Sequence, residues 1–162
     1  MNVYAWSYSR VISVMVLFIL IWKAGNRIIN IRVWKILNII GTCAAVVLIL
    51  KFTVWGRESS GQHIFMLAAS YSGEFFREML MNVFLYFPLG LTLTCVAGCW
   101  SILLGGILSV LIETWQFIIG TDVAQGTDVL CNVFGIVVGS CAYISWAKSV
   151  IKFYGLINKE RI

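Results

Sequence analysis

Long runs of apolar residues are the feature that most constrains how this chain can fold. A helix needs roughly 20 mostly apolar residues to cross a bilayer, and about five runs reach that length. These runs are Ala5–Ala24, Ile36–Trp55, Met79–Ala97, Trp100–Ile119 and Asp128–Ala147. Hydrophobic residues make up 60% of the chain and charged residues only 12%, a composition typical of membrane proteins. The sequence therefore predicts an all-α, polytopic membrane bundle of about five transmembrane helices. We expect a single domain over residues 1–162, with no room for a separate soluble catalytic domain.

The positive charges predict the orientation of this bundle. Eight of them lie at the end of the first run, between the first two runs or after the fifth: Lys23, Arg27, Arg32, Lys35, Lys148, Lys152, Lys159 and Arg161. The segments on the opposite side hold only Arg10, Arg57 and Arg77. Because cytoplasmic segments carry the excess of Lys and Arg, we expect the N-terminus outside and the C-terminus in the cytoplasm. The tail from Trp146 onward is expected to lie on the inner membrane surface. The net charge of +5 then indicates contact with membrane lipids and not with nucleic acid.

Polar residues inside the last two runs are candidates for function, because such residues are costly in a membrane. Those of the fourth run share an arc of about 80° on a helical wheel and those of the fifth about 60°. The residues are Gly106, Ser109, Glu113 and Gln116 in the fourth run, and Asp128, Asn132, Gly135 and Gly139 in the fifth. On each face the residues toward the inner end are small and those toward the outer end are polar. We expect the two faces to pack against each other, as small residues allow. Glu113 and Asn132 then meet in the outer third of the bilayer.

The third run adds a further polar wall. Arg77, Glu78 and Asn82 share a broad face if the helix begins early, and Glu78 and Asn82 have the i,i+4 spacing of neighbours on one face. Pro88, the only proline in the chain, is expected to kink this helix because it removes one backbone hydrogen bond.

Two interpretations of the polar residues remain open. They can join helices by hydrogen bonds of about a kilocalorie per mole or less each, or they can form a binding or catalytic pocket. The acids of the outer side are Glu74, Glu78, Glu113, Asp122 and Asp128. Since joining helices does not require several acids at one depth, we favour a pocket. His63 is the only histidine, so a zinc site with several histidines is excluded, and no metal or cofactor is predicted. The segment His63–Ser70, too short to span, is expected to cap the bundle as an interfacial or re-entrant piece.

Three motifs in this order resemble the VanZ-like family of bacterial membrane proteins. They are MNVFLYFPLG (Met81–Gly90), the E-x-x-Q of Glu113 and Gln116, and TDVLCNVFGIVVG (Thr127–Gly139). The residues that carry the resemblance are Asn82, Pro88, Gly90, Glu113, Gln116, Asp128, Asn132 and Gly135. Two positions depart from the family pattern. Asp122 stands where relatives commonly keep an arginine, and Gln125 replaces a usual acid.

The resemblance implies a protein of the bacterial cytoplasmic membrane that lowers susceptibility to teicoplanin-type glycopeptides or lipoglycopeptides. It would do so by binding or reorganising outer-leaflet lipid or drug. An alternative is an intramembrane enzyme that acts on a lipid-linked envelope precursor. Glu113 would then serve as general acid or base with Asp128 as its partner, or the two would hold a divalent cation. A third hypothesis is a proton- or ion-coupled transporter. Five spans make a monomeric transporter a poor fit, whereas a homo-oligomer could act as one.

Overall fold

The computed structural model describes residues 12–13, 16–17, 19–20, 31–55, 61, 63–67, 73–120 and 124–159. Its long helices are α2 (Ile31–Thr53), α3 (Gly73–Ala97), α4 (Trp100–Ile119) and α5 (Gly126–Lys159). Each of the four contains a segment of 20 to 23 residues that is long and apolar enough to cross a membrane. Four of the expected spans therefore have a counterpart. The expected first span, Ala5–Ala24, lies largely outside the described residues, and its described positions are helical.

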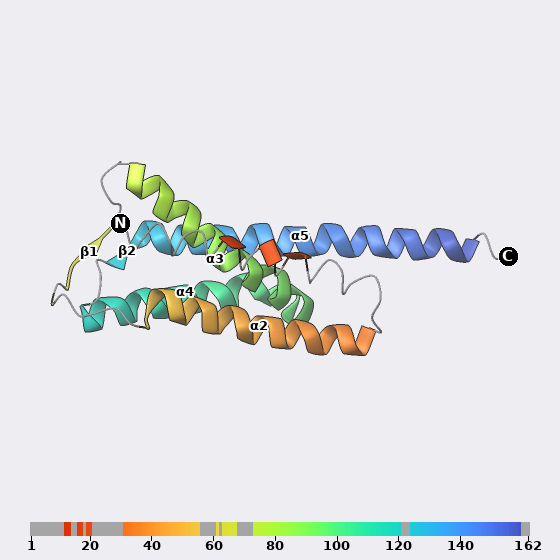
Figure 1. Cartoon of the computed structure of the whole chain (residues 1–162), viewed down its shortest axis with the longest axis horizontal. Coiled ribbons are helices and arrows are strands. Elements are labelled where there is room, and N and C mark those ends of the chain that lie inside the picture. Colours follow the sequence, from red (N-terminus) through yellow and green to blue (C-terminus); the bar gives the residue numbers. More distant parts are fainter. Residues whose placement is uncertain are drawn as a thin grey trace.

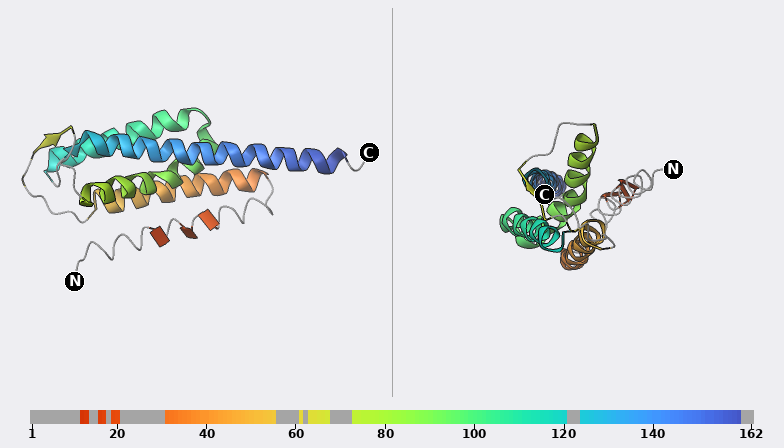
Figure 2. Two further views of the ribbon diagram at one scale, coloured as in Figure 1. Left: turned by 90° about the horizontal axis from the view of Figure 1, so that it is seen from above. Right: turned by 90° about the vertical axis from the view of Figure 1, so that its left-hand side faces the viewer.

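The four helices form an elongated bundle in which α2 and α4 run against α3 and α5 (Figure 1). One end of the bundle thus collects the C-terminal ends of α2 and α4 and the N-terminal ends of α3 and α5. We call this end the polar end. Figure 2 shows the same bundle from above and end-on. The contact between α3 and α5 is the most extensive, and α3 also packs against α2 and α4. α3 is therefore the helix around which the others assemble.

Two glycines set the limits of α4. Gly98 has a φ of 59° and reverses the chain between α3 and α4, with its N–H donating to Thr94 O at 3.0 Å. Gly120 ends α4 in the left-handed conformation, with a φ of 66°, and its N–H donates to Gln116 O and Phe117 O. Positive φ values are easily accessible only to glycine. The span expected over Trp100–Ile119 therefore has the same first and last residues as α4.

A two-stranded parallel sheet covers the polar end. β1 (Phe65–Met66) pairs with β2 (Ala124–Gln125), with Phe65 opposite Ala124 and Met66 opposite Gln125. The N–H of Ala124 also donates to Ile64 O at 3.1 Å. The segment that we expected to cap the bundle thus lies across the connection between α4 and α5, as far as it is described.

The apolar side chains divide between a small core and a wide outer surface. The core cluster consists of Ala45, Ile49, Tyr86, Leu89, Ile112 and Ile136. Many large apolar side chains on the outer faces of the helices are exposed, among them Ile107, Val110 and Leu111 of α4. Such a surface is a liability in water, whereas lipid solvates it. The exposure pattern, together with helix length, identifies a membrane protein.

α5 is longer than the span expected for it. It has 34 residues, which corresponds to about 51 Å at about 1.5 Å per residue, and the hydrocarbon core of a bilayer is about 30 Å thick. The helix continues straight through Ala147 to Lys159 (Figure 1). The tail as far as Lys159 therefore belongs to the same helix as the expected span, and its position on the membrane surface stays a prediction.

Candidate functional site

α3 and α5 approach so closely that three positions admit only glycine. A Cβ atom on Gly90 would overlap the carbonyl oxygen of Ile136. Cβ atoms on Gly135 and Gly139 would overlap the carbonyl oxygens of Val83 and Phe87, respectively. Backbone contacts of this kind are the usual product of small residues between membrane helices. The glycine face of α5 therefore packs against α3, whereas the sequence led us to expect α4 as its partner.

The contacts between α3 and α5 have a constant register. The hydroxyls of Thr94 and Ser140 lie 2.7 Å apart and are separated by 46 residues in the chain. The contact between Gly90 and Ile136 has the same separation. Parallel helices keep such a register from turn to turn, since residues four apart lie on the same face. Tyr86 is therefore level with Asn132, and Asn82 with Asp128.

α4 runs antiparallel to both helices and keeps its own register with α5. Three pairs establish it: the hydroxyls of Ser101 and Ser140 at 3.4 Å, the close approach of Gly105 to the Ile136 side chain, and the hydrogen bond between Ser109 and Asn132. Each step of four residues along α4 matches a step of four back along α5. The next pair in this register is Glu113 with Asp128.

The two registers together define four layers across α3, α4 and α5, each about 6 Å from the next at about 1.5 Å per residue. From the polar end inward they are the carboxylate layer (Asn82, Glu113, Asp128), the amide layer (Tyr86, Ser109, Asn132), the isoleucine layer (Gly90, Gly105, Ile136) and the hydroxyl layer (Thr94, Ser101, Ser140). A polar column thus enters the bundle from one end and is interrupted by one apolar layer.

The carboxylate layer is anchored to the polar end of the bundle. Glu113 is only 9% exposed, and its Oε2 accepts a hydrogen bond from the backbone N–H of Gln125 at 3.2 Å. One turn further along α4, Gln116 is buried and donates from Nε2 to the carbonyl of Thr53 at 2.7 Å. α4 is thereby joined to β2 and to the end of α2. Asn82 and Asp128 are half-buried, so this layer is the more open part of the column.

The amide layer contains two buried polar atoms that have no hydrogen-bond partner among the described residues. Asn132 donates from Nδ2 to Ser109 Oγ at 2.9 Å, but its Oδ1 accepts nothing. Tyr86 is fully buried. Its hydroxyl lies beside Ser109, but the two groups do not meet the geometry of a hydrogen bond. Each unpaired buried polar atom costs about 1–3 kcal/mol.

The two inner layers close the column. Ile136 is fully buried, and its Cδ1 packs against Gly105, where a Cβ atom would overlap it. In the hydroxyl layer, Thr94 lies 3.0 Å from Ser101 and 2.7 Å from Ser140, and it also contacts the Gly90 carbonyl. All three hydroxyls have partners, so this layer joins α3, α4 and α5 and is complete in itself.

Other residues predicted for the site lie at its edge. Arg77 and Glu78 are exposed near the start of α3, where each has an interaction partner. Asp122 lies outside the described residues. Gly106 is half-buried, and a Cβ atom there would make only an ordinary contact of 3.6 Å with Val133. The close approach is made by the neighbouring Gly105. Pro88 is buried, and α3 continues through it.

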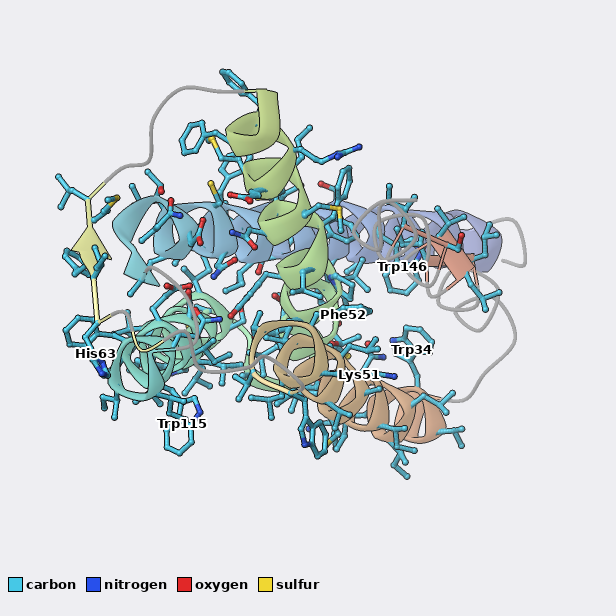
Figure 3. All side chains as sticks on the ribbon, turned by 60° about the vertical axis from the view of Figure 1, so that its left-hand side comes forward. Trp34, Lys51, Phe52, His63, Trp115 and Trp146 are labelled. Carbon is cyan, nitrogen blue, oxygen red and sulfur yellow. The ribbon has the colours of Figure 1, made fainter. Side chains whose placement is uncertain are left out.

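His63 is held at the polar end but outside the column. Its Nδ1 lies 2.8 Å from the carbonyl oxygen of Phe117, and its ring packs edge-on against the Phe117 ring. In Figure 3 His63 lies beside α4, and Trp115 projects from that helix away from the rest of the bundle. In the described part of the chain, no group of three or more His, Cys, Asp or Glu side chains could hold a metal ion.

Sequence reasoning missed part of the column. The residues that it did not select are Tyr86, Thr94, Ser101, Gly105, Ile136 and Ser140. Their signal was a step of four residues, which recurs on each helix from Asn82 to Thr94, from Ser101 to Glu113 and from Asp128 to Ser140. Residues with this step share a helix face, so extending each polar face inward would have found them.

The comparison with known protein families agrees with the motifs. The family model described as VanZ/LLP1 matches residues 6–148, a range that includes all four layers. Among curated proteins none matches the chain, and none of the solved structures does. Because the family model covers most of the chain, this protein belongs to the VanZ/LLP1 family.

Proposed function

We propose that this protein acts in the bacterial cytoplasmic membrane and lowers susceptibility to glycopeptide and lipoglycopeptide antibiotics of the teicoplanin type. It does so by binding or reorganising an outer-leaflet lipid, or the drug itself, at the carboxylate layer. Membership in the VanZ/LLP1 family suggests the reduced susceptibility to these antibiotics. The polar column suggests the carboxylate layer as the position where the ligand binds. The observation that carries the proposal is the carboxyl group of Glu113. It is nearly buried, yet it stands at the mouth of a polar column.

The charge distribution supports an extracytoplasmic position for this mouth. α2 begins and α5 ends at the end of the bundle opposite the polar end (Figure 1). The basic residues Lys35, Lys148, Lys152 and Lys159 belong to these two segments. Under the positive-inside rule that end is cytoplasmic, so the polar end faces the outer leaflet. Glycopeptides act on that side of the membrane.

The isoleucine layer favours binding over transport. A proton- or ion-coupled transporter needs a polar path through the bundle, whereas Ile136 separates the amide layer from the hydroxyl layer. The enzymatic alternative keeps Glu113 as general acid or base, with Asp128 level with it. A change in the cellular lipid profile that depends on Glu113 would favour this alternative.

The test is antibiotic susceptibility in a strain that lacks the gene and carries it back on a plasmid. Wild-type protein is expected to restore reduced susceptibility to teicoplanin. Glu113→Gln keeps the shape of the side chain but removes its charge, and we expect it to lose most of that effect. Membrane levels of each variant are measured by immunoblotting, so that only equally abundant proteins are compared.

Thr114→Val provides the matched control on the same helix. Thr114 is exposed, and among the described residues its hydroxyl bonds only to the carbonyl of Val110 at 2.7 Å, so this variant should behave like wild type. The proposal fails if Glu113→Gln restores reduced susceptibility fully, or if deletion of the gene leaves killing by teicoplanin unchanged.

A further inference from the structure

The amide layer offers hydrogen bonds that the described part of the protein does not use. Asn132 Oδ1 can accept, and the Tyr86 hydroxyl can donate and accept, yet both atoms are buried without a partner. Unsatisfied buried groups are rare in folded proteins, and they often mark a bound water, an ion or a catalytic role. Here both belong to the same layer, one turn inside Glu113, because Tyr86 is level with Asn132 in the α3–α5 register.

The side chain of Asn132 has a fixed orientation. Its Nδ2 donates to Ser109 Oγ at 2.9 Å, which leaves Oδ1 as the free acceptor. Ser109 lies beside the Tyr86 hydroxyl as well, so the donor and the acceptor flank one serine. On its inner side the layer rests on Ile136, which is fully buried. The amide layer is therefore closed on its inner side, and on its outer side it adjoins the carboxylate layer, where Asn82 and Asp128 are half-buried.

We propose that the amide layer is a recognition subsite for a neutral hydroxyl group on the headgroup of a membrane lipid, either a glycerol or a sugar hydroxyl. A hydroxyl donates once and accepts twice, so it can donate to Asn132 Oδ1 while accepting from Tyr86. This inference names the ligand class for the proposed function and rests on it for the route of entry.

The charges around the layer argue against a phosphate as the group bound there. Glu113 and Asp128 are close enough to Tyr86 to act on it electrostatically, and both carry negative charge when ionised. The exposed Arg77 is nine residues, more than two helical turns, before Tyr86 on α3. A phosphate at the amide layer would meet carboxylates and would lack a cation in the same layer.

The test measures lipid binding to the purified full chain by native mass spectrometry, with probes that differ only in hydroxyl groups. Phosphatidylglycerol is compared with phosphatidylpropanol of the same acyl chains, since both carry one phosphodiester and a three-carbon headgroup and only the first has headgroup hydroxyls. Monoglucosyl diacylglycerol is compared with the same lipid whose four glucose hydroxyls are methylated. The wild type is expected to prefer the hydroxyl-bearing member of at least one pair by about tenfold, the effect of one hydrogen bond of ordinary strength. The preferred pair identifies glycerol or sugar as the source.

Tyr86→Phe removes only the hydroxyl, and we expect it to abolish this preference without lowering the melting temperature. Among the described residues the group has no hydrogen-bond partner to lose, whereas removal of a hydrogen bond that supports the fold would lower stability. Thr94→Val, two turns further along α3 and behind Ile136, should keep the preference. The inference is overturned if wild type binds both members of each pair equally, if Tyr86→Phe keeps the preference, or if Tyr86→Phe melts at a clearly lower temperature. If Glu113→Gln restored reduced susceptibility fully, the proposed function would be overturned instead. The lipid preference of the wild type would remain.

Discussion

The buried hydroxyl groups of the described residues are of two kinds: those that have hydrogen-bond partners within the fold and one that has none. The first kind stabilises the fold, and we assign the second to ligand recognition. Thr94, Ser101 and Ser140 bond to one another and need nothing else. Tyr86, two turns away on the same helix, is equally buried but has no partner among the described residues. Stabilising polar groups are satisfied within the fold, while unsatisfied ones are costly unless a ligand compensates them. The hydroxyl layer is therefore assigned to stability and the amide layer to recognition.

Thr94→Val should destabilise the protein by about 1–2 kcal/mol. The change keeps the shape of the side chain but removes a hydroxyl that bonds to two others, on different helices, so the two serines lose a partner. Reversible unfolding of the purified protein in mixed micelles of increasing SDS content measures the difference. Thr114→Val removes a hydroxyl that is exposed and bonds within its own helix, and it should cost less than about 0.5 kcal/mol. Equal effects of the two changes would remove the structural role assigned to the hydroxyl layer.

At the scale of whole helices, the contact between α3 and α5 decides the position of every layer. Gly90, Gly135 and Gly139 bring the two backbones into contact, and that contact fixes the register that places Tyr86 level with Asn132. A shift by one residue would turn each of these side chains by about 100° around its helix. The close packing of the glycines is thus a condition for the column, to which Gly90 itself belongs.

Gly139→Ala should destabilise the protein by about 2 kcal/mol or more. Its Cβ atom would meet the backbone of Phe87, Gly90 and Leu91, which cannot move aside as a flexible side chain can. Gly106→Ala is the matched change on α4, where the nearest atom is a methyl group at 3.6 Å. There the better helix propensity of alanine should leave stability unchanged or raise it by up to about 1 kcal/mol. The same unfolding measurement in micelles compares them, and the reverse order would contradict the close α3–α5 contact.

The limits of these helices can be predicted well from the sequence. Which helices contact one another can be predicted less well. The limits of α4 were predictable because Gly98 and Gly120 end its apolar run at both sides. The polar face of each helix follows from its periodicity, but periodicity does not say which helix that face meets. The glycines of α5 were for this reason assigned to α4 instead of α3. Tyr86 was missed because it lies within MNVFLYFPLG, which reads as a continuous apolar run.

Taken over its full length, the column is more exposed at the polar end and closed at the other. The carboxylate layer lies toward the polar end, beneath the paired strands β1 and β2, and the isoleucine layer closes the column further in. The ends of α2 and α5 that carry Lys35, Lys148, Lys152 and Lys159 lie at the opposite end (Figure 1). This arrangement suits a protein that receives a ligand from one leaflet and retains it there. The proposed function therefore depends most on which leaflet the polar end faces.

Cysteine labelling in intact cells measures that orientation directly. Leu67 at the polar end is 80% exposed, and Cys99 is exposed in the turn between α3 and α4, where α3 ends and α4 begins. Two variants are compared, one with Leu67→Cys as its sole cysteine and one that retains only Cys99. With a membrane-impermeant maleimide, we predict that Leu67→Cys is labelled in intact cells and that Cys99 is labelled only after the cells are permeabilised. The opposite result, with Cys99 labelled from outside and Leu67→Cys protected, would place the column on the cytoplasmic side and contradict the proposed function.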